Sequence, residues 1–120
     1  APKIVIVDDD RLILRAASRL LEIGGITCVR FEDGAAAIDY IEREGDGISL
    51  VWTDFDLNQR VSGIDVLNAT TRRSPAPLAL LVTASTDLPT TPTGTILRDK
   101  SDIREVIAFV RDLVAPGSRA

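Results

Sequence analysis

The sequence predicts a single α/β domain with a parallel sheet, because strand-like and helix-like segments alternate along its 120 residues. Uninterrupted apolar, β-branched runs at residues 3–7, 48–52 and 78–82 predict strands that are buried on both faces. Such strands are typical of a parallel sheet covered by helices and joined by right-handed crossovers. More polar segments at residues 26–31 and 94–98 predict the two edge strands.

Two helices are predicted in the first half of the chain. The first spans residues 11–23, ends at the Gly24-Gly25 pair, and places one apolar stripe at Leu12, Ala16, Leu20 and Ile23. The second is capped by Asp33 and ends near Gly45 and Gly47. Its inward positions are Ala37, Ile38 and Ile41.

Two more helices are predicted in the second half. Ser62 and Asp65 form a capping-box pattern that opens a helix to about Arg72. The last helix has apolar residues at i, i+3, i+4 and i+7 spacing, namely Ile103, Val106, Ile107, Val110, Leu113 and Val114. Residues 116–120 read as a linker or tail, so the predicted domain covers residues 1–115.

One expected crossover helix is missing from the pattern. The segment between Thr83 and the fifth strand contains Pro89 and Pro92. Proline is tolerated only in the first turn of a helix, and it pushes the preceding residue out of the α region. We therefore expect an irregular, mobile segment at residues 90–94 and no helix longer than about one turn between Thr83 and Ile96.

The composition excludes several kinds of chemistry. Histidine is absent and Cys28 is the single cysteine, so the chain can form neither Ser-His-Asp triads nor zinc sites of the usual kinds. The lone cysteine fits a reducing compartment, which makes the cytoplasm the expected location. A net charge of −4 argues against direct nucleic-acid binding, and neither a membrane-spanning run nor a signal-peptide pattern is present.

Carboxylates follow two of the predicted central strands. Asp8, Asp9 and Asp10 come after the first, and Asp54 and Asp56 after the third. Ligand sites in open parallel sheets form beyond the carboxyl ends of the strands, so these groups are expected to meet there. Two carboxylates 4 Å apart repel by about 4 kcal/mol at an effective dielectric near 20, and a hard cation such as Mg²⁺ relieves this repulsion. Each acid alone reads equally well as a helix cap or a solvated charge.

Three stretches, "IVIVDDD", "LVWTDFDLNQRVSG" and "LALLVTA", resemble the signature segments of the receiver domains of bacterial two-component response regulators. The resemblance covers nearly the whole chain. It implies a flavodoxin-like fold with strand order 2-1-3-4-5, here with the fourth helix shortened or absent. It also implies a phosphoprotein of signal transduction that acts in a phosphorelay, rather than an enzyme with an external substrate.

The resemblance implies roles for single residues. Asp54 would accept the phosphoryl group from a phosphohistidine and become an aspartyl phosphate, and Thr83 would hydrogen-bond a phosphoryl oxygen. Magnesium would bind Asp9, Asp54 and the backbone carbonyl of Asp56 directly. Asp8 would act through a water molecule. The chain has no histidine, so a partner histidine kinase or phosphotransfer protein must be the donor. Phosphorylation and dephosphorylation would be self-catalysed, and a homodimer is left open.

The chain departs from the family pattern in its loops. Asn58 stands where proline is usual, and the Asp54-to-Gly63 spacing is one residue longer than the commonest form. Ile96 stands where an aromatic switch residue is common. The fifth strand ends in "RDKS", so a gapless alignment puts Asp99 on the family's lysine position. We expect Lys100 to contact the phosphoryl group instead, through a bulge at the strand end, because a carboxylate there would repel phosphate.

Other interpretations remain. The chain could be a pseudo-receiver used only for protein contacts, and "DFDLN" resembles the Asp-x-Asp motif of haloacid-dehalogenase-type phosphatases. It could be a free-standing regulator or the receiver of a hybrid histidine kinase. Arg11, Arg15 and Arg19 form a basic stripe that reads either as a solvated face partly relieved by Glu22 or as a docking surface for an acidic partner.

Overall fold

The fold is a five-stranded parallel sheet, as the sequence pattern predicts, in the order β2-β1-β3-β4-β5 that the family resemblance implies. The computed structural model describes residues 2–44, 46–85 and 87–115, so the predicted tail at residues 116–120 lies outside the described residues. The strands are β1 (Lys3–Val7), β2 (Thr27–Phe31), β3 (Ile48–Thr53), β4 (Leu78–Thr83) and β5 (Ile96–Asp99).

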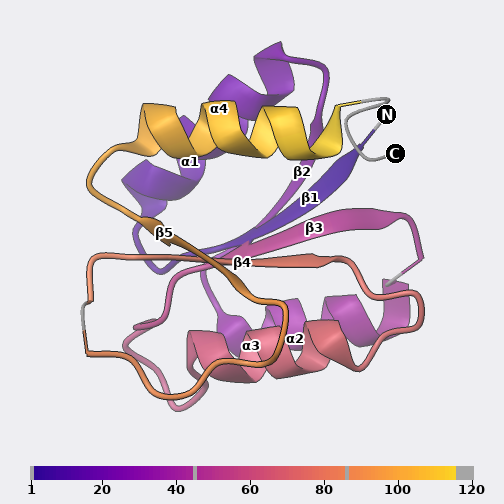
Figure 1. The fold of residues 1–120 in the computed structure, drawn as a ribbon, viewed down its shortest axis with the longest axis vertical. Coiled ribbons are helices and arrows are strands. Elements are labelled where there is room, and N and C mark those ends of the chain that lie inside the picture. Colours follow the sequence, from indigo (N-terminus) through magenta and orange to yellow (C-terminus); the bar gives the residue numbers. More distant parts are fainter. Residues whose placement is uncertain (1, 45, 86, 116–120) are drawn as a thin grey trace.

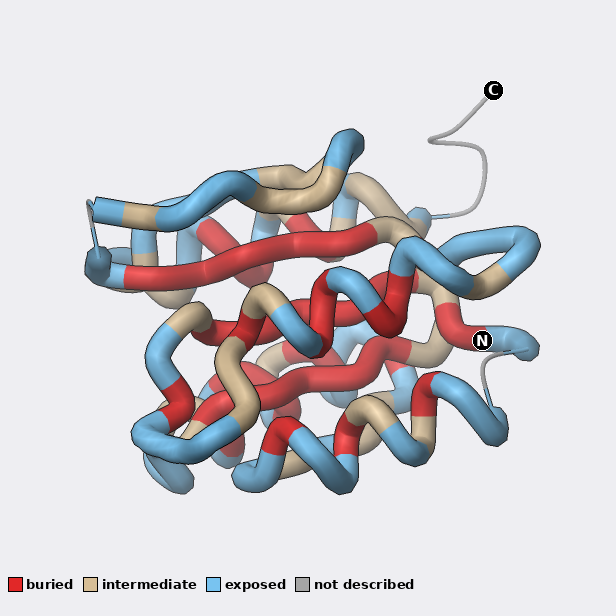
Figure 2. The backbone as a smooth tube through the Cα atoms, turned by 90° about the horizontal axis from the view of Figure 1, so that it is seen from below, coloured by how far each residue is buried: buried red, intermediate tan, exposed pale blue. Residues whose placement is uncertain are grey.

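The helices cover the sheet from both sides (Figure 1). On one face lie α1 (Arg11–Ile23) and α4 (Ile103–Val114), and on the other lie α2 (Gly34–Glu44) and α3 (Gly63–Thr71). The apolar runs of the central strands are buried between these two layers (Figure 2). Trp52 of β3 is the largest fully buried side chain.

The face that α1 buries differs from the predicted stripe. Leu12 and Ile23 are 75% and 73% exposed, and the buried residues are Leu14, Ala17, Ser18 and Leu21. Both sets follow helical spacing, so periodicity does not select between them. A search for apolar residues overlooks the buried stripe, because Ser18 is part of it.

The capping signals of the other helices are confirmed, and Gly45, predicted near the end of the second helix, lies outside the described residues. Asp33 Oδ1 accepts a hydrogen bond from the Ala35 amide at 3.0 Å at the start of α2. Asp65 Oδ2 accepts one from the Ser62 amide at 2.9 Å, as a capping box requires. Apolar positions of α2 and α4 are buried as predicted, with Ala37, Ile41, Val106, Ile107 and Val110 in the core.

The connection from β4 to β5 is irregular, as its prolines predict. Residues 84–85 and 87–95, the part of this connection that the structure describes, contain no helix. A turn at residues 93–94 places Gly94 at φ +89°. Strand β5 therefore begins at Ile96 and runs to Asp99, two residues later than predicted at its start and one residue later at its end.

Candidate functional site

Three of the predicted acidic side chains meet at the carboxyl edge of the sheet. Carboxylate oxygens of Asp8, Asp9 and Asp54 all lie within 4.8 Å of one another. Asp8 is fully buried and Asp54 is 7% exposed. They meet because β1 and β3 are adjacent and paired in parallel, with Val7 opposite Thr53.

Asp10 takes no part in this cluster. Its Oδ1 accepts a hydrogen bond from the Leu12 amide at 2.9 Å, so Asp10 caps the start of α1. The Asp10 amide itself donates to Asp8 Oδ1 at 2.9 Å. Two of the three consecutive acids therefore serve the cluster, and the third fixes the helix that follows.

Lys100 reaches the same cluster from the end of β5. Its ammonium Nζ lies 2.6 Å from Asp54 Oδ2 and 2.8 Å from Asp8 Oδ2. The predicted bulge is not the cause, because β4 and β5 pair in unbroken register up to Thr83 and Asp99. Lys100 is the first residue of a turn, with its amide bonded to the Thr83 carbonyl at 3.2 Å. Asp99 stays exposed.

The charges in the cluster are not balanced. Burial raises the pKa of Asp8 above its ordinary value, which marks the cost of holding this carboxylate ionised. Burial also opposes the charge on Lys100, but its hydrogen bonds to Asp54 and Asp8 raise the pKa of the ammonium overall. The cluster thus holds three carboxylates, and Lys100 is the one cation paired with it among the described residues, through Asp8 and Asp54. The all-oxygen, anionic donor set suits a hard divalent ion such as Mg²⁺.

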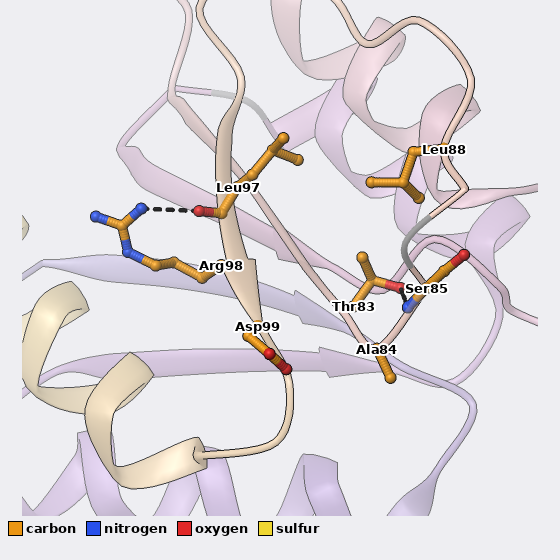
Figure 3. Close-up of a pocket in the computed structure, with 7 residues that line it drawn as sticks. All are labelled: Thr83, Ala84, Ser85, Leu88, Leu97, Arg98 and Asp99. Carbon is orange, nitrogen blue, oxygen red and sulfur yellow. Dashed lines mark hydrogen bonds between the residues drawn. The ribbon is translucent and has the colours of Figure 1, made fainter.

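Thr83 ends β4 beside this cluster and is buried. Its hydroxyl oxygen accepts a hydrogen bond from the Ser85 amide at 3.1 Å, which leaves the hydroxyl proton free to donate. Thr83 also lines an open groove of about 250 Å³ (Figure 3). The other lining residues are Ala84, Ser85, Leu88, Leu97, Arg98 and Asp99.

Leu97, and not Ile96, shares this groove with Thr83. Ile96 packs against the core cluster formed with α1 and α4 on the opposite face of the sheet. The sequence analysis expected the family's aromatic switch position at Ile96, whereas Leu97 is the β5 residue that lines the groove with Thr83. The same one-residue offset applies to Lys100. A shift of one position along a strand places each side chain on the opposite face of the sheet.

Gly63 fixes the loop beneath Asp54, a role that sequence reasoning missed. A Cβ at this position would lie 1.9 Å from the backbone oxygen of Asp54, so only glycine fits. The Gly63 amide donates to the Phe55 carbonyl at 2.8 Å. The one signal in the sequence was the Asp54-to-Gly63 spacing.

Two further loop residues that sequence reasoning did not place in the site are Asn58 and Gln59. Asn58 donates its amide N–H to Asp9 Oδ2 at 2.6 Å. Gln59 bridges to the neighbouring loop, donating to the Glu32 carbonyl at 2.7 Å and accepting from the Gly34 amide at 3.0 Å. Their partners lie 25 to 49 positions away, so no local pattern could have shown these contacts.

The basic stripe on α1 is exposed as predicted. Arg11 Nε pairs with Glu32 Oε1 at 2.8 Å, whereas relief was predicted from Glu22. This pair lies at the surface and contributes little to stability.

Residues 4–98 match the response regulator receiver domain family. The match covers most of the chain, and the chain belongs to this family. It includes Asp8, Asp9, Asp54 and Thr83 and ends two residues before Lys100, so the geometry described above is what assigns the lysine to the site. Receiver domains act in signalling with histidine kinases or phosphotransfer proteins, and the family generally binds Mg²⁺ at an acidic cluster.

The chain is also similar to a transcriptional regulator in sequence and to solved receiver domains in fold. The chain is 31% identical over 86 residues to the transcriptional regulatory protein CpxR of Escherichia coli, covering 72% of this chain and 35% of CpxR. The chain thus spans about a third of that relative's length. A receiver domain protein from Clostridium thermocellum has the same fold, with a TM-score of 0.82 and 21% identity over 95% of this chain and 94% of that one.

The receiver domain of the hybrid histidine kinase CckA also has this fold. Its TM-score is 0.79 at 20% identity, covering 93% of this chain and 98% of that one. Among the helices of the described residues, none has the length and apolarity needed to span a membrane.

Proposed function

We propose that this receiver domain is a phosphoacceptor in a two-component phosphorelay. Asp54 takes a phosphoryl group from a phosphohistidine of a histidine kinase or phosphotransfer protein, in a reaction that requires Mg²⁺. The observation that carries this proposal is the meeting of Asp8, Asp9 and Asp54 with the ammonium of Lys100 at one edge of the sheet. Phosphoryl transfer needs this combination of positioning and charge neutralisation.

In this proposal each residue of the site has a separate role in the transfer. A carboxylate oxygen of Asp54 forms the new P–O bond as the P–N bond of the phosphohistidine breaks. Asp9, Asp54 and the Asp56 carbonyl would hold Mg²⁺, with Asp8 acting through water, and the ion would supply charge neutralisation for the phosphoryl oxygens. The ammonium of Lys100, which pairs with Asp54 in the structure, binds a phosphoryl oxygen after transfer. The Thr83 hydroxyl donates a hydrogen bond to another phosphoryl oxygen.

The same site supports slow self-catalysed dephosphorylation, since water can attack the phosphoryl group held there. On this proposal the chain is a signalling module of the cytoplasm, with residues 1–115 as the receiver, that switches protein–protein contacts. The absence of a helix in the described part of the β4–β5 connection favours one alternative, a pseudo-receiver that has lost phosphorylation. The complete set of site residues speaks against it.

The test is labelling by acetyl phosphate with Mg²⁺, read by intact-mass measurement. We expect one added phosphoryl group on the wild type and none on Asp54→Asn. Asp10→Asn is the matched control, because it removes one carboxylate next to the cluster and keeps a good helix cap. Equal labelling of wild type and Asp54→Asn would overturn the assignment of Asp54. No labelling of either would leave the pseudo-receiver as the better interpretation.

A further inference from the structure

Asn58 has a backbone conformation that few residues adopt. Its φ is +53°, in the left-handed region, and asparagine is among the few non-glycine residues that occur there often. The Asp56 side chain supports this conformation, since its Oδ1 accepts a hydrogen bond from the Asn58 amide at 3.0 Å. Proline, which is usual here in the family, is confined to negative φ and could not adopt it.

Both neighbours of Asn58 are anchored. Leu57 is 1% exposed and packs in the core cluster beneath α2, and Gln59 is hydrogen-bonded to the loop before α2 at both ends of its amide. The direction of the Asn58 side chain is therefore set by the loop on either side of it. The Asn58 side chain is exposed, and its own rotamer preference does not decide this direction.

The side chain points at a predicted metal ligand. Asn58 Nδ2 lies 2.6 Å from Asp9 Oδ2. An ionised carboxylate only accepts hydrogen bonds, so the nitrogen of the amide, and not its oxygen, must face it. One bond to Oδ2 leaves Oδ1 of Asp9 available to a cation, and it restricts the rotation of the carboxylate.

We propose that Asn58 is a positioning residue for the metal site, which orients Asp9 toward Mg²⁺ and so raises the affinity for the ion. This inference rests on the proposed function only in taking Asp9 as a ligand. Hydrogen-bonding partners of metal ligands typically contribute 10- to 100-fold in metal affinity. The proposal gives a physical purpose to the longer loop and to the replacement of proline.

Calorimetric titration of the unphosphorylated protein with Mg²⁺ tests the proposal. Asn58→Gly removes the amide and keeps the left-handed backbone without strain. Arg60→Gly is the matched control, because Arg60 is exposed in the same loop and the change adds the same backbone freedom. We expect Asn58→Gly to raise the Kd for Mg²⁺ by roughly 10-fold or more, and Arg60→Gly to change it less than twofold.

A second readout separates positioning from general damage to the loop. Labelling by acetyl phosphate is measured against Mg²⁺ concentration. For Asn58→Gly we expect a higher half-saturating Mg²⁺ concentration and a wild-type rate at saturation, whereas a distorted site would lower the rate at saturation as well.

The outcomes are distinct. An unchanged or lower Kd in Asn58→Gly would overturn the positioning role, since the amide would then be neutral or a competitor of the ion. A lowered rate at saturation would also overturn it in favour of a structural role. Failure of the wild type to bind Mg²⁺, with Asp9→Asn as the reference for a broken site, would overturn the metal site of the proposed function itself.

Discussion

Two segments leave the carboxyl edge of the sheet, and they are built differently. Residues 55–62, between β3 and α3, are held by the buried Leu57, by Gln59 and by the contact of Gly63 with Asp54. The described residues 84–85 and 87–95, between β4 and β5, contain two prolines and border the open groove beside Thr83, with Leu88 half-buried at its wall. The segment after Asp54 is anchored in the core and to a neighbouring loop, and the described part of the segment after Thr83 is mostly exposed.

This difference separates two tasks of a receiver. Accepting a phosphoryl group requires groups held in fixed positions, whereas passing on the signal requires a part of the molecule that can rearrange. The site residues lie with the anchored segment and at strand ends. The groove and the irregular connection lie between β4 and β5, where the sequence analysis expected the family's crossover helix to be shortened or absent. We therefore expect phosphorylation chemistry to tolerate changes in the second segment and to depend on the anchored residues of the first, Leu57 and Gln59.

The largest effect is expected from substitution of Gly63, which directly follows the first segment and begins α3, compared with substitution of Gly94 inside the second segment. Gly63→Ala would place a Cβ 1.9 Å from a backbone oxygen, so we expect a loss of about 3 kcal/mol or more in the free energy of unfolding. Gly94→Ala meets nothing within 4 Å and should cost about 1 kcal/mol, from its positive φ alone. Urea denaturation measures both. Similar losses for the two variants would remove the distinction between the segments.

Lys100→Ala should have the next largest effect, on phosphorylation. The ammonium is the one cation bonded to Asp54 among the described residues, and removing a charge that stabilises a transferring phosphoryl group typically costs about 100-fold in rate. The labelling rate with acetyl phosphate and the affinity for beryllofluoride in Mg²⁺ both report it. If neither changes, Lys100 does not contact the phosphoryl group.

Asp8→Asn should stabilise the metal-free protein. Because burial raises the pKa of Asp8 above its unfolded value, its ionisation lowers stability as the pH rises through that interval. We expect the variant to be more stable than wild type at pH 7, with the gain shrinking in acid as wild-type Asp8 takes up a proton. Urea denaturation with a chelator at several pH values measures this. A variant less stable than wild type at pH 7 would show that the Lys100 pair outweighs the burial cost.

The smallest effect is expected from Leu88→Ala. Leu88 is half-buried against the cluster of Leu67, Ala79 and Leu81, so we expect a loss of roughly 1 kcal/mol in stability and less than a twofold change in labelling rate. Amide hydrogen exchange adds a second measure, with fast exchange expected at residues 87–95. Slow, helix-like protection there would contradict the description of this segment as irregular.

Much of the fold could be predicted from the sequence, because the central strands are buried on both faces and so read as unbroken apolar runs. The edge strand β5 carries Arg98 and Asp99, and its bounds were correspondingly off by one or two residues. The buried face of α1 was wrong, because two stripes satisfied the same periodicity and one of them contains Ser18.

The site residues that directly follow strands could be predicted from the sequence. The loop residues that contact the site from distant positions could not. Strand order brings Asp8, Asp9 and Asp54 together, and the chemical argument against Asp99 led to Lys100. Asn58 could not have been found in this way. Its contact with Asp9 depends on a positive φ and a loop shape that neither spacing nor composition encodes.

The central claim is that Asp54 alone, among neighbouring acids, accepts the phosphoryl group. Borohydride reduces an aspartyl phosphate and marks its position for peptide mass spectrometry. After acetyl phosphate and Mg²⁺, we predict the mark at Asp54, with Asp8, Asp9 and Asp56 unmodified. A mark on any of those three, or none on a protein shown to bind Mg²⁺, would contradict the account.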